Sequence, residues 1–124
     1  MKSKVKLLFL AMDFGNYDLG YEEETHDEIL DFIKKVKEYD VKIVILSTQD
    51  NVPGRIKESC DNHVVKDGIA KSNYAAICNS TGVHKYNCIT ISSAKEAAIN
   101  SIQAGISVIS LGIMENYGQD NNVS

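Results

Sequence analysis

Five short apolar runs alternate with helix-forming segments along this chain of 124 residues, and this alternation restricts the fold more than any other feature. The runs are rich in Val and Ile and nearly continuous, as is typical of strands buried on both faces of a sheet. They are Val5–Ala11, Val41–Leu46, His63–Val65, Asn87–Ile91 and Ser107–Leu111. We therefore expect an α/β fold with a single doubly wound, parallel five-stranded sheet in the order 3-2-1-4-5 and helices on both faces.

Four helical segments are expected between these runs. The first has Thr25 as its expected N-cap and Glu28 three residues later, and Ile29 and Ile33 then repeat on one face. The other three are expected over about Asn51–Cys60, Lys71–Ser80 and Ser93–Gly105. We assign residues 1–114 to one domain and residues 115–124 to a polar C-terminal tail.

The charge balance argues against two classes of partner. The formal net charge is −4, so the chain has no general attraction for nucleic acid or an anionic membrane. The longest apolar run, Leu7–Met12, is far too short to span a bilayer. The N-terminus lacks the apolar core of a secretory signal. We expect a cytoplasmic protein without a nucleic-acid or membrane partner.

The three cysteines do not form a recognisable motif. Cys60, Cys78 and Cys88 are odd in number and show no C-x-x-C spacing, which favours free, buried thiols. A zinc site with His63 or His84 is the alternative, although no ligand spacing supports it.

A ligand site is expected at the carboxyl ends of the strands. In a doubly wound sheet of this order, ligands bind where the winding reverses, between the first and fourth strands. This places residues 11–18, 47–50 and 92–96 around one crevice.

These segments resemble the motifs of the haloacid dehalogenase (HAD) superfamily, and the resemblance covers most of the chain. In that superfamily the first strand runs into Asp-x-Asp, and the first Asp is the nucleophile that accepts the phosphoryl group. Here the corresponding residues are Ala11, Met12 and Asp13. Alanine has no oxygen with which to attack phosphorus or hold a metal. The resemblance therefore implies a phosphatase fold from which the nucleophile is missing.

The later motifs are matched in part. The resemblance implies that Ser47, followed by Thr48, binds phosphate at the end of the second strand. It also implies that Lys71, or Lys66 in its place, neutralises developing charge. Ser93 stands where the metal-binding Asp would be. Ala97 stands where the next acidic residue would be, with Glu96 beside it. A helix capping box explains both Ser93 and Glu96 completely and is the favoured interpretation. It would still leave a helix N-terminus at Ser93 that could hold an anion.

Within the superfamily, residues 11–20 resemble the first motif of the small, capless deoxyoctulosonate-phosphate phosphatases. That likeness implies no cap domain and a homo-oligomer, with a tetramer as the common form in that group. A competing resemblance is to the first phosphate loop of actin-like ATPases, through Asp13, Phe14 and Gly15. That fold needs two larger lobes, for which this chain is too short.

Three functions stay open at this point. The leading hypothesis is a degenerate phosphatase-fold protein without hydrolase activity, which binds a phosphate-containing small molecule, another anion or a protein partner and needs no cofactor. The second is an active Mg²⁺-dependent phosphatase of a small phosphorylated metabolite, with Asp13 as its catalytic residue and Asp13, Asp18, Asp50 and Glu96 as candidate metal ligands. The third is a structural oligomerisation scaffold, for which exposed apolar residues would be the sign.

Overall fold

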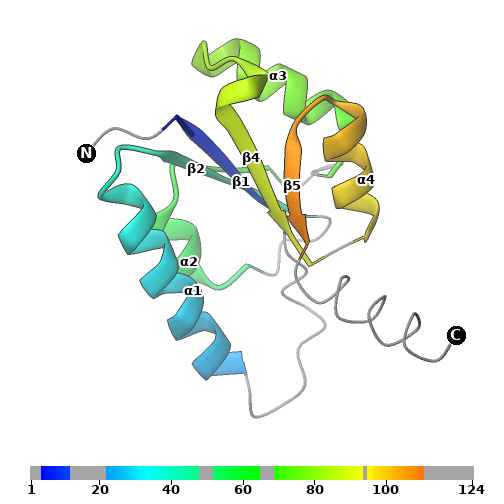
Figure 1. The fold of residues 1–124 in the computed structure, drawn as a ribbon. Helices are drawn as coiled ribbons and strands as arrows, with labels where there is room; N and C mark the ends of the chain where they lie inside the picture. The colour runs from blue at the N-terminus through cyan, green and yellow to red at the C-terminus, as the bar shows by residue number, and fades with distance from the viewer. Residues whose placement is uncertain (1–3, 12–21, 48–51, 65–68, 94, 111–124) are drawn as a thin grey trace, which may run out of the picture.

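The computed structural model of the chain describes residues 4–11, 22–47, 52–64, 69–93 and 95–110 (Figure 1). Strands and helices alternate along these residues. In chain order they are β1 (Leu7–Ala11), α1 (Glu22–Lys37), β2 (Lys42–Leu46), α2 (Gly54–Ser59), β3 (Asn62–Val64), α3 (Lys71–Thr81), the 3-10 helix η1 (Lys85–Asn87), β4 (Cys88–Ser92), α4 (Lys95–Gln103) and β5 (Ser107–Ser110).

The strands form one parallel sheet in the order β3-β2-β1-β4-β5. β1 is central, and its residue Leu7 is aligned with Lys42 of β2 and Cys88 of β4. Figure 1 shows α1 and α2 on one side of the sheet and α3 and α4 on the other. The chain therefore has the expected parallel α/β architecture, with helices covering both faces.

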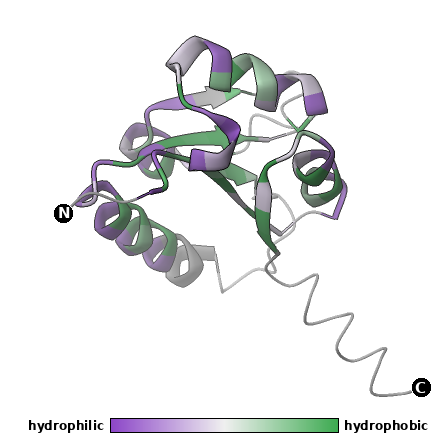
Figure 2. Ribbon diagram, turned by 45° about the horizontal axis from the view of Figure 1, so that its top comes forward, coloured by the Kyte–Doolittle hydropathy of each residue, from purple (hydrophilic) through white to green (hydrophobic). Residues whose placement is uncertain are grey.

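Successive residues of β1 pack on opposite faces of the sheet, because side chains alternate along a strand. Leu8 and Leu10 belong to the apolar core beneath α1 and α2, together with Ile33 and Ile56 of those helices. Figure 2 shows the apolar residues of α1 turned toward the sheet and its polar residues turned away. Burial of this helix face stabilises the fold through the apolar area removed from water.

The second core lies beneath α3 and α4 and contains a polar network. Tyr74 of α3 is fully buried, and its ring meets Phe9 of β1 edge-on at a centroid distance of 4.9 Å. Its hydroxyl donates a hydrogen bond to the carbonyl oxygen of Ala97 at 3.1 Å. Ser101 Oγ lies 2.8 Å from Thr90 Oγ1, so these buried hydroxyls are hydrogen-bonded.

Helix starts differ from the sequence expectation. α1 begins at Glu22, so Thr25 lies inside the helix and is not its N-cap. Glu22, Glu23 and Glu24 favour the earlier start, because acidic residues interact well with the positive N-terminal end of the helix dipole.

In contrast to α1, the helices α2 and α4 begin later in the chain than the sequence predicts. α2 begins at Gly54, after Pro53, whose φ of −55° and ψ of 137° are extended rather than helical. α4 begins at Lys95, one residue later than an N-cap at Ser93 predicts. α3 ends where predicted, because Gly82 takes the left-handed conformation with φ 73°.

Two further expectations concern parts outside the described ranges. Leu111 and the tail at residues 115–124 lie outside the described residues.

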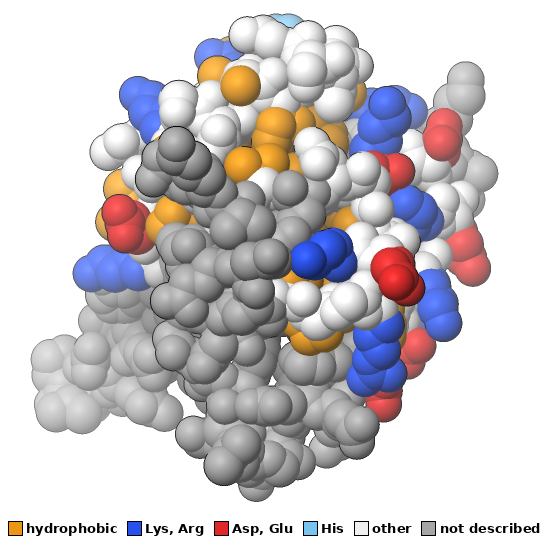
Figure 3. Space-filling model, turned by 180° about the vertical axis from the view of Figure 1, so that it is seen from behind, with side chains coloured by type: hydrophobic (Ala, Val, Ile, Leu, Met, Phe, Trp, Pro, Cys, Tyr) orange, Lys and Arg blue, Asp and Glu red, His pale blue; other side chains and the backbone are white. Residues whose placement is uncertain are grey.

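Within the described ranges, every helix is too short or too polar to cross a membrane. Figure 3 shows described side chains of both charge signs interspersed over one face of the molecule.

Candidate functional site

The carboxyl ends of β1 and β4 lie side by side at one edge of the sheet. Ala11 is aligned with Ser92, and the backbone N–H of Ser93 donates to the carbonyl oxygen of Ala11 at 3.3 Å. Ser47 follows β2 at the same edge, and its N–H donates to the carbonyl oxygen of Val64 at 3.1 Å. Three of the sequence-derived positions, Ala11, Ser47 and Ser93, thus come from neighbouring strands.

The side chains at these strand ends are buried. Ala11 is 1% exposed and belongs to the apolar core that includes Phe9, Tyr74 and Ala97. Ser47 is 3% exposed and Ser92 is fully buried. The described strand ends therefore present hydroxyls and a methyl group. None of these three side chains is a carboxylate, so none could serve as a carboxylate nucleophile or a carboxylate metal ligand.

Helix N-termini at this edge provide positive electrostatic potential. α3 and α4 each follow a strand, so their first turns lie beside the carboxyl ends of the sheet. Lys71 is the first residue of α3 and is exposed, and no side chain caps this N-terminus at Ala70. Glu96 is exposed in the first turn of α4, where a negative charge is favourable. The role of Lys71 as a phosphate-binding cation stays a prediction.

Several candidates from the sequence cannot be placed in this geometry. Residues Asp13, Asp18, Asp50, Thr48 and Lys66 lie outside the described residues, as do the side chains of His26 and His63. Within the described ranges, no three or more His, Cys, Asp or Glu side chains are grouped so that they could hold a metal ion.

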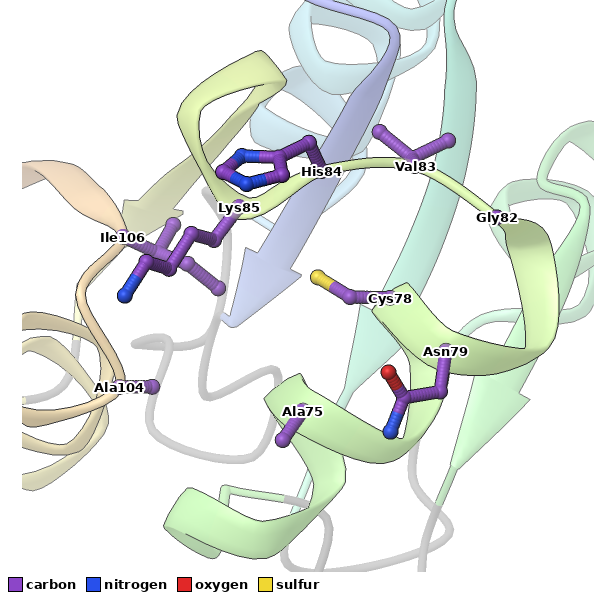
Figure 4. A pocket seen from close by; sticks show the side chains of 9 residues that line it. All are labelled: Ala75, Cys78, Asn79, Gly82, Val83, His84, Lys85, Ala104 and Ile106. Atoms are coloured by element: carbon purple, nitrogen blue, oxygen red, sulfur yellow. The ribbon is translucent and has the colours of Figure 1, made fainter.

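A cavity of about 420 Å³ lies at the opposite, amino edge of the sheet (Figure 4). It is bounded by the C-terminal turn of α3, the segment Gly82–Lys85 and the turn before β5. Sequence reasoning did not predict it, because it is formed by segments that tertiary packing brings together from three parts of the chain.

Two cysteines meet beside this cavity. The Sγ atoms of Cys78 and Cys88 are 3.5 Å apart, and Cys88 Sγ donates to the carbonyl oxygen of His84 at 3.4 Å. Burial, and to a lesser extent the hydrogen bond with Cys78, raise the pKa of the Cys88 thiol to about 12. All three cysteines are free, as expected, and Cys88 is the most buried of them.

No family model matches the chain, and no curated protein matches it in sequence. Solved structures share its fold. An uncharacterized protein from Corynebacterium glutamicum superposes with a TM-score of 0.66 at 15% identity, over 86% of this chain and 85% of that one. The N-terminal part of the protein BF1531 from Bacteroides fragilis, which contains a phosphatase domain complexed with Mg, superposes with a TM-score of 0.65 at 16% identity.

The second likeness covers 87% of this chain and 36% of the Bacteroides chain, so this chain spans about a third of that structure. At these identities the likeness concerns the fold alone. This chain shares its α/β architecture with a structure that contains a phosphatase domain.

Proposed function

We propose that this chain is a capless relative of the haloacid dehalogenase phosphatases that binds a phosphate-bearing small molecule or another anion without hydrolysing it. The observation that carries the proposal is the end of β1. In the phosphatases that the chain resembles, this is where the nucleophilic Asp stands, and here it is Ala11, buried among apolar side chains. A methyl group cannot accept a phosphoryl group.

A second loss supports the same conclusion. Ser93, which follows β4, occupies the place of a metal-binding Asp in the resemblance. Losing a nucleophile alone costs about 10⁶-fold in kcat in a well-studied hydrolase. Losing a metal ligand as well removes charge that would neutralise the phosphoryl oxygens. The two losses together leave a site that can bind but has little means of catalysis.

The groups that would hold an anion are retained. Ser47 supplies a hydroxyl at the end of β2, Thr48 follows it in the chain, and Lys71 supplies a cation at the start of α3. Backbone N–H groups at a helix N-terminus favour phosphate through both hydrogen bonding and the helix dipole. The proposed ligand is therefore a phosphate monoester or inorganic phosphate, and no cofactor is required for its binding.

The test of lost catalysis is release of phosphate from an aryl phosphate in the presence of Mg²⁺. The matched control is Asp13→Asn, purified in the same way, because it removes the remaining carboxylate of the first motif. The proposal expects the two proteins to release phosphate at the same background rate. Mg²⁺-dependent release that is lost in Asp13→Asn would overturn it and establish an active phosphatase in which Asp13 is the nucleophile.

Exposed apolar residues support a second candidate function, an oligomerisation scaffold. Ile99 and Ile102 are 43% and 61% exposed on α4, and a spacing of three residues places them on one helix face. We infer that this face contributes to a homo-oligomer, for which a tetramer is the form implied by the resemblance.

Sedimentation of three proteins tests this assembly. Ile102→Lys places a charge on the apolar face, whereas Gln103→Lys adds the same charge at an exposed polar position of the same helix. Dissociation in Ile102→Lys alone supports the scaffold. A wild-type protein that sediments as a monomer at all concentrations rejects it.

A further inference from the structure

Cys78 and Cys88 come from different elements and converge at the amino edge of the sheet. Cys78 lies in the last turns of α3, and Cys88 is the first residue of β4. Their sulfur atoms are 3.5 Å apart, whereas a disulfide bond is about 2 Å long, so bonding requires an approach of about 1.5 Å. Figure 4 shows the Cys78 side chain pointing into the cavity, on the far side of which Lys85 extends.

The two thiols differ in their access to solvent. Cys78 is half-buried and lines the cavity of about 420 Å³, which is wide enough to admit small solutes. Cys88 is 4% exposed and lies behind it, hydrogen-bonded to the carbonyl oxygen of His84. Burial raises the pKa of Cys88, which keeps that sulfur protonated and unreactive toward an oxidant in solution. An oxidant that enters the cavity therefore meets Cys78 first.

We propose that Cys78 and Cys88 form a peroxide-sensitive dithiol, in which Cys78 is oxidised first and Cys88 then closes an intramolecular disulfide bond. The site is independent of anion binding, because it lies at the edge of the sheet opposite Ala11 and Ser47. The co-reactant is hydrogen peroxide or a small organic hydroperoxide.

The chemistry proceeds in two balanced steps. The Cys78 sulfur attacks the terminal peroxide oxygen, the O–O bond breaks, and the Cys78 thiol proton goes to the departing oxygen. The products are a sulfenic acid and water or an alcohol. Cys88 sulfur then attacks the Cys78 sulfur, and the sulfenic hydroxyl leaves as water with the proton of the Cys88 thiol. The two sulfurs lose two electrons in total and the peroxide gains them. Because the Cys88 S–H is directed at the His84 carbonyl oxygen, a sulfur lone pair is left available toward Cys78.

Oxidation would fix one wall of the cavity. The two cysteines are ten positions apart, and the residues between them include Gly82 and Lys85, which line the cavity. Lys85 also contacts the turn before β5, since a Cβ added at Gly105 would lie 3.2 Å from Lys85 Cδ. A bond between Cys78 and Cys88 therefore closes a short loop that carries these contacts.

A metal site is a less suitable assignment for the same sulfurs. In the part of the chain that the structure describes, no third His, Cys, Asp or Glu joins them in a group that could hold a metal ion. The two thiols are free, lie close together and differ in solvent exposure, which suits a disulfide-forming pair better than a metal site.

Peptide mapping of the full-length protein tests the proposal without relying on a variant. The protein is treated with hydrogen peroxide, free thiols are blocked with N-ethylmaleimide, and the chain is digested with trypsin. The three cysteines fall in separate tryptic peptides, Glu58–Lys66, Ser72–Lys85 and Tyr86–Lys95. We expect a cross-linked pair of the second and third peptides, a mass loss of about 2 Da in the intact chain, and a blocked thiol at Cys60.

Two variants then establish the order of the steps. In Cys88→Ser the sulfenic acid at Cys78 has no resolving thiol, so dimedone should label Ser72–Lys85 after peroxide treatment. Cys60→Ser is the matched control and should form the same cross-link as wild type, because Cys60 packs against the core on the other face of the sheet. Cross-links between chains, cross-links to Cys60, or a Cys78 that is only overoxidised or unmodified would each overturn the proposal.

Discussion

Ala11 of β1 and Ser92 of β4 form the last aligned pair of the two central strands, and both side chains are buried. In a doubly wound sheet this is the place where ligand-binding groups gather. The backbone pairing of β1 and β4 is regular up to this point, since the Ser93 N–H donates a hydrogen bond to the Ala11 carbonyl oxygen at 3.3 Å. The difference from a working phosphatase, on our proposal, therefore lies in side-chain chemistry and not in the fold.

Restoring a carboxylate at the end of β1 should destabilise the protein. Ala11→Asp would place a charge in the core that contains Phe9 and Tyr74. The penalty is about 1.4 kcal/mol for each unit by which burial raises the pKa of the new carboxyl. It is fully present at pH above the raised folded-state pKa. It disappears as the pH falls toward the unfolded value of about 4.

Urea unfolding at pH 7 and pH 4 measures this effect, with Ala11→Asn as the control of similar size. The control should lose the same stability at both pH values, since it carries no charge. If Ala11→Asp were as stable as Ala11→Asn at pH 7, the end of β1 would have to be a polar environment.

The Tyr74 hydroxyl should contribute measurably to the second core. Tyr74→Phe keeps the edge-on contact with Phe9 but leaves the Ala97 carbonyl oxygen without this donor. We predict a loss of about 1 kcal/mol in the free energy of unfolding. Tyr74→Ala, which also opens a cavity, should cost about 3–5 kcal/mol. Equal stability of wild type and Tyr74→Phe in urea titrations would refute the role given to the hydroxyl.

Asp61 should make the protein more stable at neutral than at acidic pH. Partial burial acts to raise its pKa, but the Ile43 N–H at 2.8 Å and Lys37 Nζ at 3.1 Å outweigh it and lower that pKa below its ordinary value. The contribution is therefore present above the unfolded-state pKa of about 4 and is lost as the pH falls through the lower folded-state pKa.

Asp61→Asn tests this linkage by thermal or urea unfolding. The variant should be less stable than wild type at pH 7. The difference in their free energies of unfolding should disappear as the pH falls below about 4. Asp27→Asn, which removes the exposed ion pair with Arg55, should cost about 0.5 kcal/mol or less at pH 7. A gap between Asp61→Asn and wild type that stays constant with pH would contradict the assignment.

Gly105 should tolerate a side chain less well than Gly82. Both have positive φ, 82° and 73°, so alanine at either costs about 1–2 kcal/mol. At Gly105 the new Cβ also comes within 3.2 Å of Lys85 Cδ, whereas nothing lies within 4 Å of it at Gly82. Stability measurements should therefore rank Gly105→Ala below Gly82→Ala. If Lys85 moves aside at no cost, the two variants will be equally stable.

The sequence predicted the parts of this fold that depend on local burial. β1 is a continuous apolar run, β2 is apolar after Lys42, and Gly82 marks the end of α3 through its left-handed conformation. The sequence predicts too late a start for α1, because the spacing of Thr25 and Glu28 is typical of a capping box, whereas the helix already begins at Glu22.

Features made by long-range packing could not be predicted. The contact between Cys78 and Cys88 and the cavity beside it depend on how the end of α3 meets the turn before β5. No periodicity or motif in one chain encodes that distance. Likewise, the sequence could place Ser47 at a strand end, but only the packing of β2 shows that it is 3% exposed.

Calorimetric titration of inorganic phosphate, with and without Mg²⁺, tests the central claim most directly. The account predicts that the wild-type protein binds phosphate without Mg²⁺. It predicts that Ser47→Ala binds about tenfold more weakly, because a hydrogen bond to a charged group contributes about 1.5 kcal/mol. Ser80→Ala, at the far end of α3, should bind as wild type does. Absence of phosphate binding, or binding only when Mg²⁺ is present, would contradict the account.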